Sequence, residues 1–372
     1  MSQRSVLVVN TGSSSLKWVV LDAHTEQVQD QGEASWEDTQ VGRHETELRV
    51  ALDRAPEVDA VGHRVVHGGS RFHEAVLVDA GVRDEILELA ELAPLHNPAA
   101  VAGIDVARAR FPSVPQVAAF DTAFHATLPR VAAVYPLPWE WTTDWGLRRF
   151  GFHGLSVEYA VRRAAELLNG LPQRMVVCHL GAGCSVTAVM DGRSVDTSMG
   201  FTPLEGVMMA RRSGSVDPGL LLYLMRQHGL TAADLEIALN ERSGLSGVSG
   251  VSADLRQILA AADAGNERAQ LARDLFARRI VGTVGRMVAV LVGLDALLFT
   301  GGIGEHSQVI RAAVCDSLSY LGLSLDPRAN AERADDGDVA ALDSAVRVLV
   351  VAAREDLSIL RQVVRTLGWD SA

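Results

Sequence analysis

The chain is poor in cysteine, with only Cys178, Cys184 and Cys315 among 372 residues. Three thiols are too few for a disulfide framework, and the absence of a C-x-x-C motif argues against a structural zinc site. The most apolar stretch, residues 287–299, is interrupted by an aspartate and falls short of the about 20 residues that a membrane helix needs. Only a few apolar residues precede Asn10, which is too short for a signal peptide. We therefore expect a cytoplasmic protein that does not contact a membrane.

Positive charge is also in deficit, since 34 Lys and Arg face 46 Asp and Glu for a net charge of −12. An acidic chain argues against nonspecific nucleic-acid binding. Several catalytic signatures are absent as well: G-x-S-x-G, H-E-x-x-H, the phosphate loop G-x-x-x-x-G-K-[ST], and G-x-G-x-x-G with a downstream acid. What remains is a well-packed globular protein, with 48% hydrophobic and 22% charged residues and a length that predicts two domains.

Strands and helices alternate along the chain, which favours an α/β fold. We expect strands at 6–9, 114–120, 175–179, 296–300 and 347–352, a hairpin over 185–197, and helices over 82–92, 156–168, 267–294 and from about 353 to 367. Ser156 is predicted to cap the second of these helices. Residues 30–60 are polar and weakly patterned, so we interpret them as a surface excursion. A strand–turn–strand unit occurs at 6–22 and again at 175–190, which predicts two similar α/β halves.

Three turns of small residues each follow an apolar strand: NTGSSS at 10–15, GAGCS at 181–185 and GGIGE at 301–305. Small residues let an anion approach the backbone, and the hydroxyls of Thr11, Ser13, Ser14 and Ser15 add donors. Each turn alone could be an ordinary glycine turn. Three together indicate nucleotide binding.

Cationic and polar side chains gather in stretches that look like loops. They are His63, Arg64 and His67 in GHRVVHGG, Asp121 and His125 in FDTAFH, His153 in RRFGFHGLS, and Arg211, Arg212 and Asp217 in MMARRSGSVDPG. Arginine in a small-residue loop suits carboxylate or phosphoryl recognition, although a loop arginine is more often a solvated side chain. A phosphate cradle, a metal ligand and cations are the parts that phosphoryl transfer needs, and all are present here.

Ten segments, in this order, closely resemble acetate kinases: VLVVNTGSSSLK, GHRVVHGG, LAPLHNP, FDTAFH, RRFGFHGLS, HLGAG, DTSMGFTPLEGVMM, RSGSVDPG, ADLR and FTGGIGE. The resemblance runs from about residue 6 to about residue 360. It implies the superfamily of acetate and sugar kinases, Hsp70 and actin, with two duplicated actin/ribonuclease-H-like α/β domains around a nucleotide cleft. The implied domains are residues 1–122 plus 356–372 and residues 123–355, in a chain that forms a homodimer.

The resemblance implies reversible phosphoryl transfer from ATP to acetate, giving acetyl phosphate and ADP, with Mg²⁺ for which Mn²⁺ could stand in. It assigns catalysis to Asp121, His153 and Arg212, and Mg²⁺ to Asn10 and Glu355. Arg64 would bind the acetate carboxylate, while Val66, Leu95, Phe152 and Pro203 would form its methyl pocket. The nucleotide would contact Lys17, His179, Leu180, Gly181, Ala182, Gly183, Asp254, Leu255, Arg256, Gly302, Ile303, Gly304, Glu305 and His306.

Three positions depart from the family pattern: Ala182 and His306 each replace an asparagine, and Arg354 precedes Glu355. These departures bear on nucleotide preference and on the alignment of Glu355. Two alternatives to an acetate kinase stay open. One is a propionate or butyrate kinase on the same fold, against which Val66 favours a pocket for acetate. The other is a non-catalytic nucleotide switch, which would not need Arg64, His153 and Arg212 together.

Overall fold

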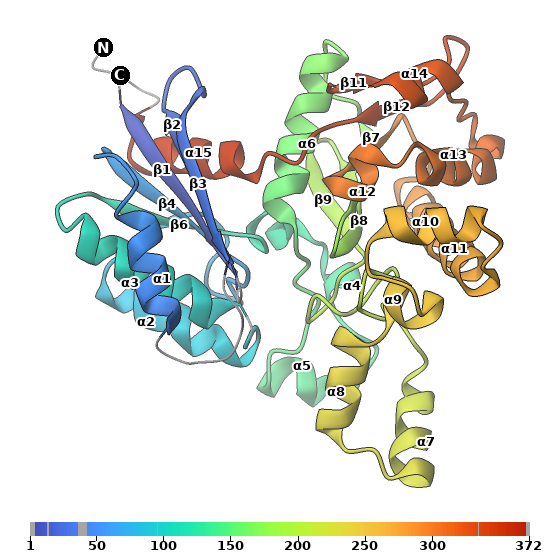
Figure 1. Cartoon of the computed structure of the whole chain (residues 1–372), viewed down its shortest axis with the longest axis horizontal. Coiled ribbons are helices and arrows are strands. Elements are labelled where there is room, and N and C mark those ends of the chain that lie inside the picture. The colour runs from blue at the N-terminus through green and yellow to red at the C-terminus, as the bar shows by residue number, and fades with distance from the viewer. Residues whose placement is uncertain (1–3, 13–14, 36–42, 95, 334, 370–372) are drawn as a thin grey trace. The chain divides into compact units, whose positions relative to one another are not determined.

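The computed structural model of the protein describes residues 4–12, 15–35, 43–94, 96–333 and 335–369 (Figure 1). The chain divides into two compact units. Unit 1 comprises Met1–Ala126, Phe152–Tyr159 and Arg354–Ala372, and unit 2 comprises Thr127–Gly151 and Ala160–Ala353. Within the described ranges, no helix has both the length and the apolar character needed to cross a membrane.

Unit 1 is built on a six-stranded mixed sheet in the order β3-β2-β1-β4-β6-β5. Its strands are β1 (Ser5–Thr11), β2 (Ser15–Asp22), β3 (Val28–Ser35), β4 (Ala60–Val65), β5 (Val76–Leu77) and β6 (Gln116–Phe120). Its helices are α1 (Arg43–Leu52), α2 (Ala80–Glu88), the 3-10 helix η1 (Leu89–Glu91), α3 (Asn97–Arg110) and α15 (Glu355–Thr366). The 3-10 helix η2 (Ala123–Thr127) and α6 (Gly154–Leu167) each begin in unit 1 and end in unit 2.

Alternation along the central strands of unit 1 decides which helix covers which face of the sheet. Leu7 and Val9 pack with Leu52 of α1 and Val106 of α3 in one apolar cluster. Gly62 points to the other face, where an added Cβ would lie 2.6 Å from Ile359 of α15. Helix α15 therefore lies directly on β4, and the close approach needs a glycine there.

Unit 2 holds a second six-stranded sheet, in the order β11-β12-β10-β7-β8-β9. Its strands are β7 (Arg174–Leu180), β8 (Cys184–Met190), β9 (Arg193–Thr197), β10 (Ala296–Thr300), β11 (Gly337–Asp338) and β12 (Arg347–Val350). Its helices are α4 (Arg130–Ala133), α5 (Trp139–Asp144), α7 (Pro218–His228), α8 (Ala232–Glu241), α9 (Gly244–Ser249), α10 (Leu255–Asp263), α11 (Glu267–Leu291), α12 (Gly301–His306), α13 (Gln308–Ser317), η3 (Ser319–Leu321) and α14 (Pro327–Glu332).

The two sheets have the same topology, which confirms the prediction of two similar halves. In each sheet three antiparallel strands form a meander, and the first of them pairs in parallel with the next long strand. That strand pairs in parallel with another, which carries a short antiparallel edge strand. Strands β7 and β10 are buried along nearly their whole length, as apolar central strands of such a sheet must be.

Two local predictions were wrong. The segment predicted as a polar excursion forms β3 and α1, because an edge strand with mostly exposed side chains carries no apolar alternation, and α1 buries only a narrow stripe that includes Leu48. Ser156 does not cap α6; the helix begins at Gly154, whose N–H donates to the carbonyl of Asp121 at 2.8 Å. The three cysteines are free and buried, in agreement with the absence of a disulfide framework.

Acid should destabilise the protein through His63, which is 2% exposed and whose Nε2 lies 2.7 Å from Oε1 of Gln116. Burial lowers the pKa of His63 to about 4, and the hydrogen bond to Gln116 only partly offsets this shift. Because the unfolded chain binds this proton more tightly, stability is retained above about pH 6.5 and falls as pH drops towards 4. We expect about 2 kcal/mol of the loss between pH 7 and pH 4.5 to come from this group. Urea unfolding of wild type and His63→Gln at both pH values should show that difference; identical pH dependences would contradict it.

Candidate active site

A cavity of about 850 Å³ lies in unit 2, where the turn after β7, the loop before α7, the start of α10 and helix α12 meet. The lining residues predicted from the sequence are Gly181, Ala182, Gly183, Asp254, Leu255, Arg256, Gly302, Ile303, His306 and Arg212. Five other residues predicted for the nucleotide site do not line this cavity: Lys17, which belongs to unit 1, and His179, Leu180, Gly304 and Glu305. Two of the three small-residue turns thus contribute to one cavity.

The pairing of β7 with β10 brings these two turns together. The strands are parallel, with His179 level with Thr300, so their carboxyl ends lie at the same edge of the sheet. Gly301 has a φ of +76°, and a Cβ added there would lie 2.8 Å from the carbonyl oxygen of Leu180. Only glycine allows α12 to begin this close to the end of β7.

Internal hydrogen bonds determine which polar groups of the cavity remain for a ligand. Gly181 donates its N–H to the carbonyl of Gly183 at 3.0 Å, so the backbone donors of this turn are fewer than the motif suggests. Asp254 accepts the N–H of Arg256 at the start of α10 and also pairs with its guanidinium at 2.6 Å. The one acidic side chain of the lining is therefore already neutralised, and the remaining charged groups are cationic.

Arg212 is the most informative of these cations. It is half-buried, and its Nη1 donates only a long hydrogen bond, 3.4 Å, to the carbonyl of Pro203. Among the described residues it has no ion pair with an acid. Burial lowers the pKa of the guanidinium, but arginine stays charged. A desolvated cation beside a cavity and without a counter-ion indicates an anionic ligand.

The lining also contains residues that sequence reasoning missed. They are Ala210, Asn240, Ala253, Leu259, Ser307, Gln308 and Val309. Most lie on α8, α10 and α13, whose sequence patterns indicate only amphipathic helices. Aliphatic side chains such as Leu259 and Val309 add an apolar part to a lining that also contains arginines. That combination suits a ligand with an uncharged ring and an anionic tail.

Unit 1 carries a separate cluster of charged groups at the carboxyl ends of its central strands. Arg64 donates from Nε and Nη2 to the two oxygens of Asp121, at 3.0 and 2.7 Å. Its Nη1 lies 3.1 Å from Oε2 of Glu355. The Asp121 side chain is 1% exposed, and those of Arg64 and Glu355 are 18% and 19% exposed. One arginine fork thus holds two carboxylates from different segments.

Burial and charge act against each other in this cluster. Burial lowers the pKa of Arg64, but the charges of Asp121 and Glu355 and the hydrogen bond to Asp121 raise it by more, so the net shift is upward. Burial raises the pKa of Glu355, and the charge of Arg64 lowers it. The charges of Asp121 and Asp356 raise it further, so the net shift is upward. Two acids share one cation, so the cluster has an excess of negative charge.

The strand register places Asn10 and Lys17 on the same face of the sheet as Arg64. Val9 is level with His63 in the parallel pair of β1 and β4, which puts Asn10 beside Arg64. Asn10 is opposite Lys17 in the hairpin of β1 and β2, and partners in register point to the same face. The Lys17 side chain is 70% exposed, and its ammonium lies 4.0 Å from the carboxylate of Glu33. The hydroxyl of Thr11, by contrast, packs against Gly103 of α3.

Asn10 and Glu355 fit a metal only as a partial ligand set. No group of three or more His, Cys, Asp or Glu residues suited to a metal is found in the described ranges. A hard cation held by one carboxylate, one amide oxygen and the phosphates of a substrate does not need such a group. The half-buried carboxylate of Glu355 and the excess negative charge around it are compatible with that mode of binding.

The segment with His153 is fixed against Asp121 by its backbone. His153 has a φ of +60°, a conformation that costs energy for a residue with a side chain. The next residue, Gly154, is required, because an added Cβ would lie 2.3 Å from the carbonyl oxygen of Asp121. Nε2 of His125 lies 2.9 Å from the carbonyl oxygen of Phe152. Strain held in place by several contacts is typical of functional loops.

The predicted methyl-pocket residues are distributed between the units. Val66 is half-buried and Phe152 is fully buried in unit 1, where the Phe152 ring packs edge-on against His67. Pro203 belongs to unit 2. Leu95, together with Ser13 and Ser14 of the first hairpin, lies outside the described residues.

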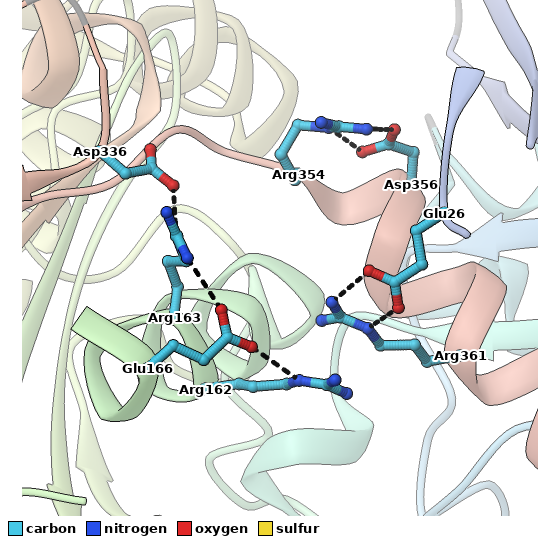
Figure 2. A network of polar contacts seen from close by, with 8 residues as sticks. All are labelled: Glu26, Arg162, Arg163, Glu166, Asp336, Arg354, Asp356 and Arg361. Carbon is cyan, nitrogen blue, oxygen red and sulfur yellow. Dashed lines mark hydrogen bonds and ion pairs between the residues drawn. The ribbon is translucent and has the colours of Figure 1, made fainter. Parts of the chain in front are cut away.

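Arg354 forms an ion pair with Asp356, two residues later in the chain. Its Nε and Nη2 donate to the carboxylate of Asp356 at 2.8–3.1 Å, as Figure 2 shows. Arg354, which departs from the family pattern, therefore has Asp356 as a counter-ion. Glu355 keeps Arg64 as its ion-pair partner.

The motif DTSMGFTPLEG has a structural role that its sequence did not reveal. Its Glu205 accepts from Nη2 of Arg149 at 2.8 Å and from the hydroxyl of Tyr135. Arg149 also donates to the carbonyls of Ser198 and Met199. This partly buried network fixes the loop that leads to Pro203.

Comparisons with known proteins agree with this architecture. A model of the acetokinase family matches residues 35–361. The acetate kinase of Gloeobacter violaceus is 47% identical over 96% of this chain and 98% of its own, and that of Trichormus variabilis is 51% identical over 84% and 77%. The crystal structure of Porphyromonas gingivalis acetate kinase superposes with a TM-score of 0.90 at 37% identity, covering 98% of this chain and 100% of that one. A propionate kinase from Francisella tularensis gives 0.88 at 36% identity, covering 96% and 98%.

The protein has a duplicated α/β fold, with two six-stranded sheets of the same topology, and shares this fold with an acetate kinase structure. Within that class, the chain belongs to the acetokinase family.

Proposed function

We propose that the protein is an ATP:acetate phosphotransferase that forms acetyl phosphate and ADP reversibly. The observation that carries the proposal is Arg212, a half-buried cation without an acidic partner among the described residues, on the wall of the cavity in unit 2. Arg212 would stabilise the charge that spreads over the transferring phosphoryl group. The arginines and aliphatic residues of the cavity match the phosphates and the base of ATP. Membership of the acetokinase family supports the same activity.

Acetate is already ionised near neutral pH, so its attack on the γ-phosphoryl group needs no general base. The role that we assign to Asp121 is therefore to position a cation. Both of its oxygens accept from Arg64, which fixes the plane of the guanidinium. Arg64 would hold the acetate carboxylate, and His153 would act with Arg212 on the phosphoryl group. The two arginines offset the repulsion between two anions.

We propose Mg²⁺ as the metal, held by Asn10, Glu355 and the nucleotide phosphates. When bound, it would neutralise phosphate charge and orient the γ-phosphoryl group. Glu355 also has Arg64 as an ion-pair partner, at 3.1 Å. Mn²⁺, which also prefers oxygen ligands, should substitute.

From the resemblance to acetate kinases, we propose that Val66, Leu95, Phe152 and Pro203 would contact the methyl group of the acid. A pocket of this kind discriminates weakly, because one methylene is worth only about 1–3 kcal/mol. We therefore expect acetate to be preferred and propionate to react more slowly. The resemblance to a propionate kinase makes that acid the principal competitor.

Trapping of acyl phosphate with hydroxylamine tests this function. The protein is incubated with ATP, Mg²⁺ and acetate, propionate or butyrate, and hydroxamate is measured. Most hydroxamate from acetate is the expected result. More hydroxamate from propionate than from acetate would show that propionate is the preferred substrate. ATP binding without any hydroxamate would favour a non-catalytic switch.

Lys17 is the single lysine of the chain, and we propose that it contacts the nucleotide phosphates. Its exposed ammonium has only a distant ion pair, so it is available to a ligand. Lys17→Ala should raise the KM for ATP about tenfold, with a smaller change in kcat. Lys17→Arg keeps the charge, so its KM for ATP should lie between those of wild type and Lys17→Ala. An amine-specific reagent should modify this one side chain and be slowed by ATP. An unchanged KM in the alanine variant would remove Lys17 from the nucleotide site.

We also propose a cytoplasmic homodimer whose interface includes α7. This helix has no buried residue, yet its sequence is PGLLLYLMRQH, and Leu222 and Tyr223 are 54% and 49% exposed. A helix that is apolar on all sides is stable in water only when another surface covers it. A second copy of the chain would supply such a surface by two-fold symmetry.

Leu222→Glu should convert the dimer to a monomer by placing a charge in the interface. Light scattering after size exclusion measures the mass, and Leu342→Glu, at a fully exposed position, should leave it unchanged. A wild-type monomer, or a Leu222→Glu dimer of unchanged affinity, would contradict the proposal.

A further inference from the structure

The segment that leaves unit 2 towards Glu355 is held by two carboxylates. Val351 still follows the sheet, because its N–H donates to the carbonyl of Phe299 at 2.9 Å. The next two N–H groups leave the sheet pattern. Ala352 donates to Oδ1 of Asp336 at 2.8 Å, and Ala353 donates to Oε1 of Glu305 at 3.0 Å. Ala353 is the last residue of unit 2, and Glu355 begins α15 two residues later.

The two carboxylates belong to different parts of unit 2. Asp336 is anchored away from the cavity, since its Oδ2 accepts from Nε of Arg163 on α6 at 2.8 Å (Figure 2). Glu305 lies on α12, between cavity residues Ile303 and His306, but does not itself line the cavity. Its side chain extends from the cavity wall to the backbone of the departing segment.

A buried arginine caps the carboxyl end of helix α12. Arg311, which is 2% exposed, donates from Nη1 to the carbonyls of Gly304 and Glu305 at 2.9 and 2.7 Å. Its Nε donates to Asn330 at 2.7 Å. A charged donor shared by the last carbonyls of a short helix keeps its last turn intact. A shift of the cavity wall therefore carries the Glu305 carboxylate with it.

We propose that Glu305 is a positioning residue that links occupancy of the cavity to the backbone leading into Glu355. The inference rests on the proposed function only in taking the cavity ligand to be a nucleotide. In this scheme, a ligand that contacts Gly302 and Ile303 restricts the position of α12. The hydrogen bond from Ala353 to Glu305 then restricts the backbone at the start of α15. The nucleotide thereby prepares the carboxylate of Glu355 before any acid binds. Glu305 touches neither the nucleotide nor the acid in this scheme.

Amide hydrogen exchange of the full-length protein tests the link with ADP alone, without metal or acid. In wild type, ADP should slow exchange in the peptide covering residues 351–357 by about tenfold. Glu305→Ala should abolish that protection while the Kd for ADP stays within threefold. Glu305→Gln, whose amide oxygen still accepts a hydrogen bond, should retain most of it. The kcat of Glu305→Ala should fall, and Glu305→Gln should recover part of that loss.

Asp336→Ala is the matched control, since it frees the neighbouring N–H without touching α12. It should speed exchange at Ala352 in the free protein and keep the effect of ADP. Full ADP protection in Glu305→Ala would overturn the inference, as would a Kd for ADP raised more than tenfold in that variant, which would place the carboxylate on the nucleotide. Failure of wild type to bind ADP would instead overturn the proposed function, a result distinct from either of these.

Discussion

Replacing Arg212 with alanine should lower kcat by about a thousandfold while the KM for acetate changes little. The guanidinium is half-buried beside the cavity and has no acidic partner in the described part of the chain. It therefore meets a full negative charge only when the phosphoryl group is present. An arginine that stabilises a phosphoryl transition state is worth about 10³–10⁵ in rate. Steady-state kinetics in both directions measures the loss.

Arg211 provides the matched control for this prediction. It lines the same cavity but is exposed, so it lacks the desolvation that strengthens a charge. Arg211→Ala should mainly raise the KM for ATP. Equal losses of kcat in the two variants, or a kcat for Arg212→Ala within tenfold of wild type, would remove Arg212 from the phosphoryl group.

The second large effect is expected from Arg64→Ala, which leaves Asp121 and Glu355 without their shared cation. Breaking a buried ion pair by removing one partner costs about 3–5 kcal/mol of stability, and here the proposed acetate contact is lost as well. We expect kcat/KM for acetate to fall by about 10³-fold or more. Arg64→Lys keeps the charge but not the planar fork that reaches both acids, and should recover only part of the loss. A kcat/KM within tenfold of wild type in Arg64→Ala would contradict this role.

The same variant has a stability readout that does not depend on catalysis. Burial already raises the pKa of Glu355 with Arg64 in place, and removing Arg64 removes the one charge that opposes the shift. An acid with a raised pKa binds its proton more tightly in the folded state, so stability falls as pH rises through that pKa. Arg64→Ala should therefore gain stability relative to Arg64→Lys as pH is lowered from 8 to 5. Parallel unfolding curves for the two variants over this range would contradict that expectation.

The sequence predicted the parts of the fold that depend on apolar periodicity and strong turns. The hairpin at 6–22, its echo at 175–190 and the strand before GGIGE all have the predicted type and position. Strand β3 and helix α1 were missed because edge elements bury too few side chains to leave a pattern. Helix α6 begins at Gly154 because of a contact with Asp121, which lies far away in sequence and leaves no local capping signal.

The candidate site was predictable in composition but not in its internal contacts. The motifs predicted roles for Arg64, Asp121 and Glu355, yet nothing local shows that the Arg64 guanidinium binds both carboxylates. Long-range hydrogen bonds decide such contacts, as they do for Ala353 and Glu305. The contact of Arg354 was not predictable either. Its position beside Glu355 suggested an effect on the alignment of Glu355, but in the structure Arg354 pairs with Asp356.

Formation of ATP from ADP and acetyl phosphate tests the central claim most directly. With Mg²⁺ present, wild type should produce ATP continuously in a luciferase assay, and Arg212→Ala should produce it about a thousandfold more slowly. Binding of ADP by wild type without any ATP formed from acetyl phosphate would contradict the assignment of this protein as an acetate kinase.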